Sequence, residues 1–266
     1  MSANNFFRDL RSNNYNNGLV NNDMLYLPKT NCIYVACSKN ACSLIKSELY
    51  RIEHGTTFGK NQSPHRRTST GFLSPLDMPE QRFYELIKDR SVPKIGFVRD
   101  PFKRVISCYR NRLGSLGMEP YDNINNTRTE WILNRQKILA YQHKAICSYQ
   151  KAITEEITFE NFIRFICQQH PYEMDRHWYY QSRSLFADYI DYDYIGQIES
   201  LTASLNHVAK LIGAPKDYNF DGRRLNKSKW SAADLSLEQK TKEMFKEKFA
   251  KDYELLKNVK EKFTCE

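Results

Sequence analysis

The stretch CIYVACSKNACSLIKSELYR, residues 32–51, determines how this chain is expected to fold. Its β-branched and aromatic start at residues 33–35 predicts a short buried strand. Small and polar residues follow at 38–42, and from Ser43 onward the apolar residues recur at helical spacing. A strand, a tight turn and a helix in this order direct free backbone N–H groups and a helix dipole at an anion. The sequence therefore predicts a phosphate-binding turn.

This turn differs from the P-loop of nucleoside triphosphate-binding proteins. The string G-x-x-x-x-G-K-[ST] is absent, and the turn contains no glycine. Lys39 and Ser43 keep a cation and a hydroxyl, but the lysine lies in the turn instead of opening the helix. On this stretch alone, a surface lysine beside a half-exposed serine is the alternative interpretation.

A second strand and helix are predicted in KIGFVRDPFKRVISCYRNRL, residues 94–113. Pro101 suits the first position of a helix, where its missing N–H costs nothing. Arg99 ends the strand, and Ser107 follows eight residues later, two turns into the helix. Both side chains could reach one phosphate over the helix start, since arginine offers a planar fork and serine one further donor.

The run RDPFKRVISCYR, together with the lysine-containing turn before it, resembles the carbohydrate sulfotransferases of the Golgi type and their bacterial relatives, sulfotransferase family 2. The family's first turn is similar to P-K-x-G-C-S-N-W-K, which corresponds to residues 38–46 here. The resemblance implies that this turn binds the 5′-phosphosulfate of PAPS (3′-phosphoadenosine 5′-phosphosulfate) and that the second run binds the 3′-phosphate. The cofactor-binding residues that it implies are Lys39, Asn40, Ala41, Cys42, Ser43, Leu44, Arg99 and Ser107.

The resemblance continues to about residue 257. Residues 177–181 and 194–199 are similar to the family's H-W-x-P-Q and Y-D-x-I-G-x-F-E runs, and residues 226–228 and 251–256 resemble its C-terminal region. Departures occur at Ser38, Ile45 and residues 186–188, and they concern acceptor recognition rather than the cofactor.

Length and composition indicate a folded globular enzyme. A chain of 266 residues with 41% hydrophobic residues is long enough for one α/β domain, which we expect to span residues 31–266. Residues 1–30 are rich in asparagine and predict a loosely ordered arm. No apolar run of about 18 residues is present, and no signal peptide is visible, which favours a bacterial cytoplasmic protein.

The net charge and the cysteines indicate which ligands the protein could bind and whether its thiols are free. A net charge of +9 indicates affinity for anions, and no zinc-finger, RNP or helix-turn-helix signature supports nucleic-acid binding. Of the seven cysteines, Cys32, Cys37 and Cys42 fall five residues apart, a spacing that suits neither a metal site nor a disulfide framework, so we expect buried free thiols.

Strands alternating with helices predict a three-layer parallel α/β sheet of the P-loop and sulfotransferase type with additional helices, and with ligands at the strand C-termini. A middle region without strands is expected to form a helical insertion that grips the acceptor. The other predicted elements are helices over residues 79–90, 131–149, 159–167, 201–212 and 236–250, with a capping box at Ser236, and a strand over residues 194–198.

Sulfuryl transfer needs a cation at the leaving oxygen, donors around the sulfonate and a base for the acceptor hydroxyl. Lys39 is predicted to be the cation, and no metal is required. His65, in the loop between the two cofactor runs, is predicted to be the base. His177 is the alternative base or, with Trp178 as a stacking surface for a sugar ring, part of the acceptor site.

The predicted function is therefore transfer of a sulfuryl group from PAPS to a hydroxyl of a carbohydrate or glycan. Two alternatives remain open at this point: a basic protein that binds RNA or glycan without catalysis, and a nucleotide-dependent kinase of the P-loop type. The sequence identifies neither the acceptor nor the oligomeric state.

Overall fold

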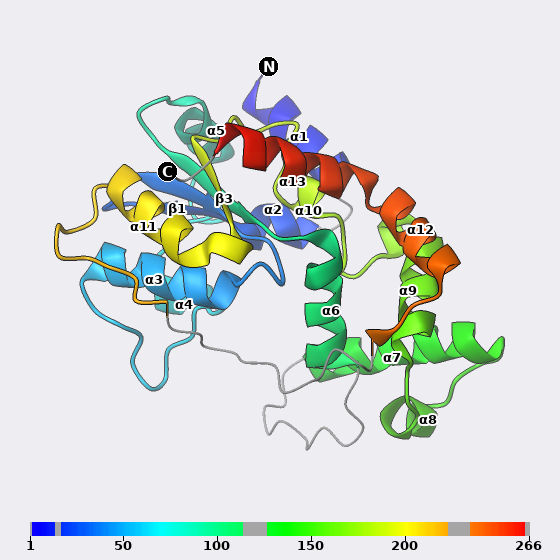
Figure 1. Ribbon diagram of the computed structural model, residues 1–266. Helices are drawn as coiled ribbons and strands as arrows, with labels where there is room; N and C mark the ends of the chain where they lie inside the picture. The colour runs from blue at the N-terminus through cyan, green and yellow to red at the C-terminus, as the bar shows by residue number, and fades with distance from the viewer. Residues whose placement is uncertain (1, 14–16, 114–126, 223–234, 264–266) are drawn as a thin grey trace. The chain divides into compact units, whose positions relative to one another are not determined.

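The structure of the protein is a computed structural model that describes residues 2–13, 17–113, 127–222 and 235–263 (Figure 1). The chain forms two compact units: the first comprises Met1–Pro101, Tyr179–Asn226 and Lys251–Glu266, and the second comprises Phe102–Trp178 and Lys227–Ala250. One domain over residues 31–266 stays a prediction. The run at residues 226–228 lies outside the described residues.

The first unit contains a four-stranded sheet in the order β1-β2-β3-β4, formed by β1 (Met24–Leu27), β2 (Cys32–Val35), β3 (Lys94–Val98) and β4 (Tyr194–Gln197). β2, β3 and β4 are parallel, with Val35 opposite Gly96 and Gly96 opposite Ile195. β1 runs antiparallel to β2, so the sheet is mixed but mostly parallel, and the predicted α/β fold class is confirmed. A short connection of residues 28–31 joins β1 to β2, and such a turn allows only antiparallel pairing.

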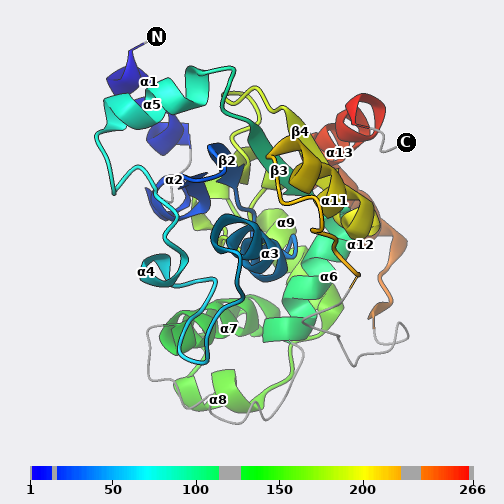
Figure 2. The ribbon, with the colours of Figure 1, turned by 90° about the vertical axis from the view of Figure 1, so that its left-hand side faces the viewer.

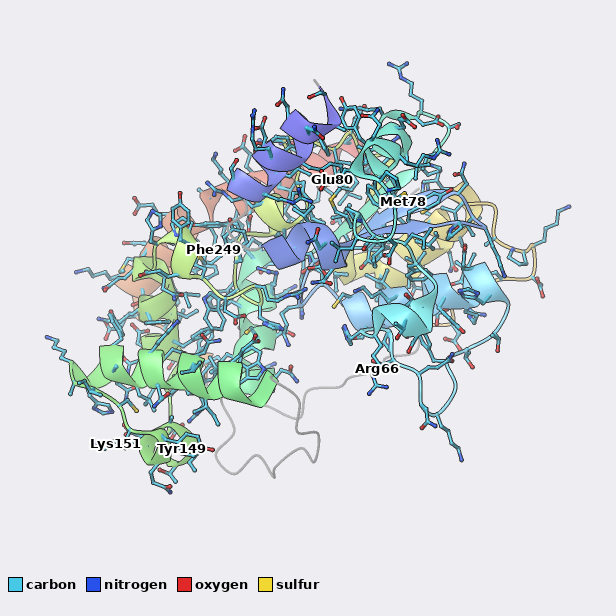
Figure 3. The ribbon with its side chains drawn as sticks, turned by 180° about the vertical axis from the view of Figure 1, so that it is seen from behind. Arg66, Met78, Glu80, Tyr149, Lys151 and Phe249 are labelled. Atoms are coloured by element: carbon cyan, nitrogen blue, oxygen red, sulfur yellow. The ribbon has the colours of Figure 1, made fainter. Side chains whose placement is uncertain are left out.

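The N-terminal residues are helical, which corrects the predicted loose arm. They form α1 (Ala3–Asn13) and α2 (Asn17–Asp23). The side chains of Phe6, Phe7 and Leu10 are at most 1% exposed, so burial outweighs the poor helix propensity of the asparagines. α1 packs beside α5 (Glu80–Lys88), and Arg11 forms an ion pair with Glu80 (Figures 2 and 3).

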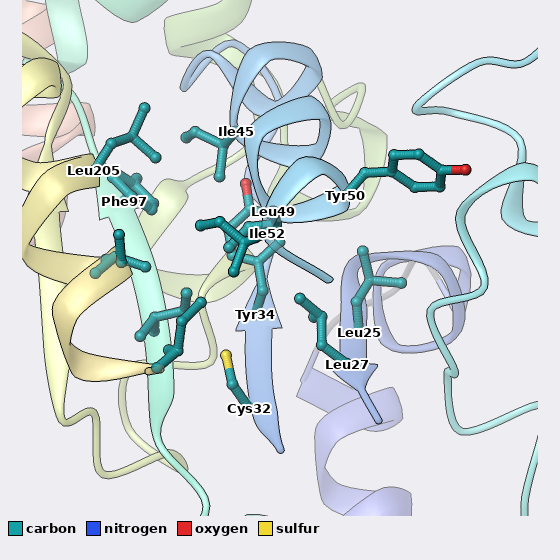
Figure 4. Packing of buried hydrophobic residues seen from close by; sticks show 14 of the residues in the cluster. Leu25, Leu27, Cys32, Tyr34, Ile45, Leu49, Tyr50, Ile52, Phe97 and Leu205 are labelled. Atoms are coloured by element: carbon teal, nitrogen blue, oxygen red, sulfur yellow. The ribbon is translucent and has the colours of Figure 1, made fainter. Parts of the chain in front are cut away.

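The core of the first unit lies between the sheet and two helices, α3 (Cys42–His54) and α11 (Leu201–Leu211) (Figure 4). Tyr34 and Phe97 project from β2 and β3 into this cluster, with ring centroids 6.3 Å apart. The opposite face of β3 meets the segment after α10 (Gln181–Ser184), because a Cβ on Gly96 would lie 3.1 Å from the Tyr192 ring. Both faces of the sheet are therefore covered. The remaining elements of this unit are α4 (Arg67–Thr70), η2 (Ile198–Ser200) and, apart from its first residue, α13 (Ala250–Lys262).

The second unit consists of helices joined by loops and contains no strand among its described residues. It consists of α6 (Pro101–Arg112) from its second residue on, α7 (Thr127–His143), α8 (Tyr149–Thr154), α9 (Phe159–Gln168), η1 (Pro171–Glu173) and α12 (Gln239–Lys248). α9 buries Phe159, Phe162, Ile163 and Ile166, and it packs against α7 and α12. The absence of strands from this region is confirmed for the residues that the structure describes.

Two predictions of helix boundaries in the second unit are wrong. The helix predicted over residues 131–149 is divided between α7 and α8, and Ser148 caps α8 by accepting a hydrogen bond from the Lys151 N–H. The capping box predicted at Ser236 is absent, because α12 begins at Gln239 after Glu238 and has no side-chain cap. Six cysteines in the described part of the chain are free thiols, four of them buried, as predicted.

We expect Gly196→Ala to destabilise the first unit. A Cβ at this position of β4 would lie 2.6 Å from Phe97 Cε1 and 2.8 Å from Ser204 Cβ, and the Phe97 ring is buried. Overpacking of this kind costs about 1–3 kcal/mol of unfolding free energy, which urea denaturation would measure. Gly59→Ala is the control, since its nearest neighbour would be Gln62 Oε1 at 3.5 Å. Equal denaturation midpoints for the two variants would contradict the expectation.

Candidate functional site

The predicted strand–turn–helix is present at the C-terminal end of β2. Its turn is strained: Lys39 and Ala41 have φ values of 68° and 52°, in the left-handed region that non-glycine residues rarely adopt. The Asn40 N–H donates to the Cys37 carbonyl over 3.2 Å and closes the turn. Strain at two of three consecutive residues is typical of a functional turn.

The start of α3 suits an anion. Ala41, the residue before the helix, provides no side-chain cap, and among the described residues the first backbone bond into the helix runs from the Ile45 N–H to the Ala41 carbonyl, 3.0 Å. The N–H groups of residues 42–44 therefore emerge at the helix end, where the dipole is positive. The donor set fits the phosphosulfate end of PAPS.

His65 lies against this helix start. Its Nε2 is 2.7 Å from Ser43 Oγ in the first turn of α3, although 21 residues of the chain separate the two. His65 is exposed, as is the neighbouring Arg66, which Figure 3 labels. Sequence analysis placed the histidine in a loop before the second cofactor run, but it did not predict this contact. The structure thus brings a candidate base to a candidate sulfonate ligand.

Arg99 approaches the same turn from β3. Its Nη1 donates to the Lys39 carbonyl over 3.0 Å, so the two predicted cofactor residues are joined directly. Beyond β4, Glu199 accepts a hydrogen bond from the Asp100 N–H over 3.1 Å. The C-terminal ends of three neighbouring parallel strands therefore converge, which is the usual ligand position in a parallel α/β sheet.

Ser107, predicted to share the 3′-phosphate with Arg99, belongs to the second unit. It is half-buried on α6, whereas Arg99 belongs to the first unit. Its part in phosphate binding stays a prediction.

His177 forms a hydrogen-bonded pair with a carboxylate in the second unit. Its Nδ1 lies 2.6 Å from Asp175 Oδ1, and Asn134 Nδ2 donates to Asp175 Oδ2 over 2.9 Å. The Trp131 ring covers the imidazole at 4.8 Å between centroids. A carboxylate on Nδ1 favours the tautomer in which Nε2 accepts a proton, so His177 also has the arrangement of a general base.

The contacts with His177 and Asn134 stabilise the ionised form of the Asp175 carboxyl group. Burial opposes its ionisation, but the hydrogen bonds from His177 and Asn134 and the attraction of His177 outweigh burial and hold the pKa of the carboxyl below its usual value. Sequence analysis missed both Asp175 and Asn134. The Asp-x-His spacing could have indicated the pair, because at this spacing the Asp175 side chain also accepts the backbone N–H of His177 over 2.9 Å.

The structure contradicts the stacking role predicted for Trp178. The indole is 0% exposed, donates through Nε1 to Gln169 Oε1 over 2.8 Å, and meets the Phe162 ring edge-on. A side chain enclosed in this way presents no face to a sugar. Trp178 is therefore a core residue of the second unit.

No group of three or more histidine, cysteine, aspartate or glutamate side chains in the described part of the chain could hold a metal ion. No helix there combines the length and the apolar character that crossing a bilayer requires. The predictions on metal and location are not tested by these findings.

Fold and site together define an α/β protein with an anion-binding turn at the ends of its parallel strands. The family model described as "Sulfotransferase family" matches residues 22–264, and the chain belongs to this family. The resemblance inferred from residues 38–46 and 99–110 is thereby confirmed.

Curated relatives are carbohydrate sulfotransferases. The chain is 28% identical over 201 residues to carbohydrate sulfotransferase 14 of Danio rerio, which is 75% of this chain and 48% of that protein. It is 29% identical over 128 residues to carbohydrate sulfotransferase 9 of Homo sapiens, or 48% and 27% of the two chains. The human carbohydrate sulfotransferase 14 is 27% identical over 158 residues, or 59% and 38%.

The chain therefore spans about half the length, or less, of these relatives. No solved structure gave a significant match. A bacterial source and a cytoplasmic location stay predictions.

We expect Asp175→Asn to destabilise the protein more at pH 5 than at pH 3. The folded pKa of Asp175 lies below its ordinary value of 3.8, so the ionised carboxylate stabilises the fold above that value. This contribution is lost as the pH falls through the folded pKa. Urea denaturation of wild type and variant at both pH values measures the difference. Asp188→Asn, at an exposed position, is the control, and a pH-independent difference for Asp175→Asn would contradict the expectation.

Proposed function

We propose that the protein is a PAPS-dependent sulfotransferase that transfers a sulfuryl group to a hydroxyl of a carbohydrate or glycan. The observation that carries this proposal is the uncapped start of α3 after a turn that contains Lys39, with Arg99 hydrogen-bonded to the same turn. Membership of the sulfotransferase family supports the reaction class, and the names of the curated relatives support a carbohydrate acceptor.

When bound, PAPS supplies the sulfuryl group: the acceptor oxygen gains the bond to sulfur, the bond from sulfur to the bridging phosphate oxygen breaks, and adenosine 3′,5′-bisphosphate leaves. The roles of the chain follow from its geometry. The N–H groups of residues 42–44 and the Ser43 hydroxyl bind the anionic sulfonate and 5′-phosphate. The Lys39 ammonium offsets charge on the leaving oxygen, and Arg99 binds the 3′-phosphate by its planar fork.

The acceptor hydroxyl must also lose a proton. His65 Nε2 is the proposed base, because it already lies within hydrogen-bond distance of Ser43, where the transferred group would be held. His177 is the second candidate, since Asp175 holds its imidazole in a suitable tautomer. A P-loop kinase would instead bind ATP with magnesium, and calorimetry with ATP in the presence of magnesium would detect this.

The nucleotide assignment is tested with Arg99→Ala. We expect this variant to bind adenosine 3′,5′-bisphosphate about 10- to 100-fold more weakly and 5′-AMP almost normally, because a charge-assisted contact to the 3′-phosphate is lost. Isothermal titration calorimetry measures both affinities. Arg82→Ala is the control, since Arg82 is exposed on α5. Equal weakening for both nucleotides would refute the role of Arg99, and no binding of the bisphosphate by wild type would refute the proposed function.

The base is tested by comparing His65→Ala with His177→Ala. We expect His65→Ala to lower turnover about 10²- to 10⁴-fold while its affinity for the bisphosphate is retained. His177→Ala is expected to raise mainly the acceptor KM. Turnover is measured at saturating PAPS with varied glycan acceptor, and His207→Ala, at an exposed position, is the control. If His65→Ala keeps normal turnover and His177→Ala is inactive, His177 is the base and His65 belongs to the acceptor site.

A further inference from the structure

Gln181 is a buried polar residue to which the proposed reaction assigns no role. Its side chain is 0% exposed and lies at the start of α10. Gln181 Oε1 accepts the Arg99 N–H over 3.1 Å, and Gln181 Nε2 donates to the Arg99 carbonyl over 2.8 Å. One side-chain amide therefore pairs with both backbone groups of Arg99, as a neighbouring strand would, just after β3 has ended.

The same amide also reaches the anion-binding turn. Asn40 Nδ2 donates to Gln181 Oε1 over 3.1 Å and to the Phe97 carbonyl over 2.7 Å. Asn40 lies between the two strained residues of the turn, so its side chain ties the turn to the end of β3. We call these hydrogen bonds among Asn40, Gln181 and Arg99 the bridge. The side chains of Asn40 and Gln181 are buried, and an unpaired buried amide would carry the full desolvation penalty.

The bridge is anchored from a third element. Asp252 of α13, 0% exposed, accepts the Gln181 N–H through Oδ2 over 2.8 Å. Its Oδ1 accepts the Ser182 N–H over 2.9 Å and the Ser182 hydroxyl over 2.7 Å. Asp252 thus fixes the first turn of α10 and, with it, the position of the Gln181 side chain.

We propose that Gln181 is a positioning residue that fixes the turn at residues 38–41 relative to Arg99, so that both phosphate ends of one bisphosphorylated nucleotide are bound at once. The inference rests on the proposed function, in which the turn and Arg99 bind opposite ends of the same nucleotide. Two half-sites held at the correct separation bind a ligand that spans them far more tightly than either binds alone, because the second contact becomes intramolecular.

A positioning role for Gln181 and a purely stabilising role predict different effects on ligand affinity. Loss of stability lowers the folded fraction and affects every ligand equally. Loss of spacing weakens the ligand that spans both half-sites and leaves ligands of one half-site almost unchanged. The discriminating quantity is therefore the affinity for adenosine 3′,5′-bisphosphate compared with 5′-AMP and 3′-AMP.

The test uses Gln181→Met, which keeps the side-chain length and removes all three side-chain hydrogen bonds. We expect its affinity for the bisphosphate to fall about tenfold or more, and its affinity for each monophosphate to change by less than about twofold. Calorimetry is performed below the unfolding temperature of each variant. Asn40→Ala removes the bridge from its other end and decides the question independently if Gln181→Met does not fold. The double variant is expected to be no weaker than either single variant, because the two residues act as one unit.

Gln169→Met is the matched control. Gln169 is 7% exposed and also makes two side-chain hydrogen bonds, from Trp178 Nε1 and to the Glu173 carbonyl, but it belongs to the second unit and takes no part in the bridge. We expect this variant to lose stability and to keep its affinity for the bisphosphate. If folded Gln181→Met or Asn40→Ala binds the bisphosphate normally, or if the affinities for all three ligands fall equally, the positioning role of Gln181 is refuted and the proposed function is unaffected. Failure of wild type to bind the bisphosphate would instead overturn the proposed function.

Discussion

The parallel pairing of β2 with β3 is the constraint on which the candidate site depends. Because Val35 lies opposite Gly96, the two strands end at the same edge of the sheet, and the chain leaves each of them toward the same side. The turn with Lys39 and the side chain of Arg99 are consequently neighbours, although 59 residues of the chain lie between them. A core of Tyr34 and Phe97 side chains beneath α3 and α11 maintains this pairing, so the apolar packing and the polar edge are two parts of one arrangement.

Sequence patterns predicted the elements whose local signals agree with their tertiary environment. β2 and β3 are short β-branched and aromatic runs buried on both faces, and the strand and turn residues between Cys32 and Ala41 occupy the positions expected of an anion-binding turn. The family assignment followed from the same residues. The contact between Ser43 and His65 could not be predicted, because a loop of polar residues joins them and its path depends on packing that no periodicity records.

The errors arose where burial overrides local preference. The asparagines of α1 predicted disorder, yet Phe6, Phe7 and Leu10 recur at helical spacing and are buried, which was the signal that the composition concealed. The Trp178 indole was assigned to a sugar by its residue type, whereas its N–H is satisfied inside the second unit. Asp175 lies two residues before His177, and Gln181 ends the run at residues 177–181. Their hydrogen bonds to Asn134 and to the Arg99 backbone join residues far apart in the sequence, so no sequence pattern predicts them.

The turn after β2 adopts left-handed backbone conformations at Lys39 and Ala41 without glycine, and this affects the entropy cost of binding an anion. A glycine-rich loop samples many conformations and loses that freedom when an anion orders it. Here Lys39 and Ala41 are confined by their side chains, and the buried amide of Asn40 fastens the turn to β3 before any ligand arrives. The conformational entropy is given up during folding, so contacts with an incoming anion are not offset by ordering the loop. The unliganded turn is in this respect a rigid template whose shape is stored as local backbone strain.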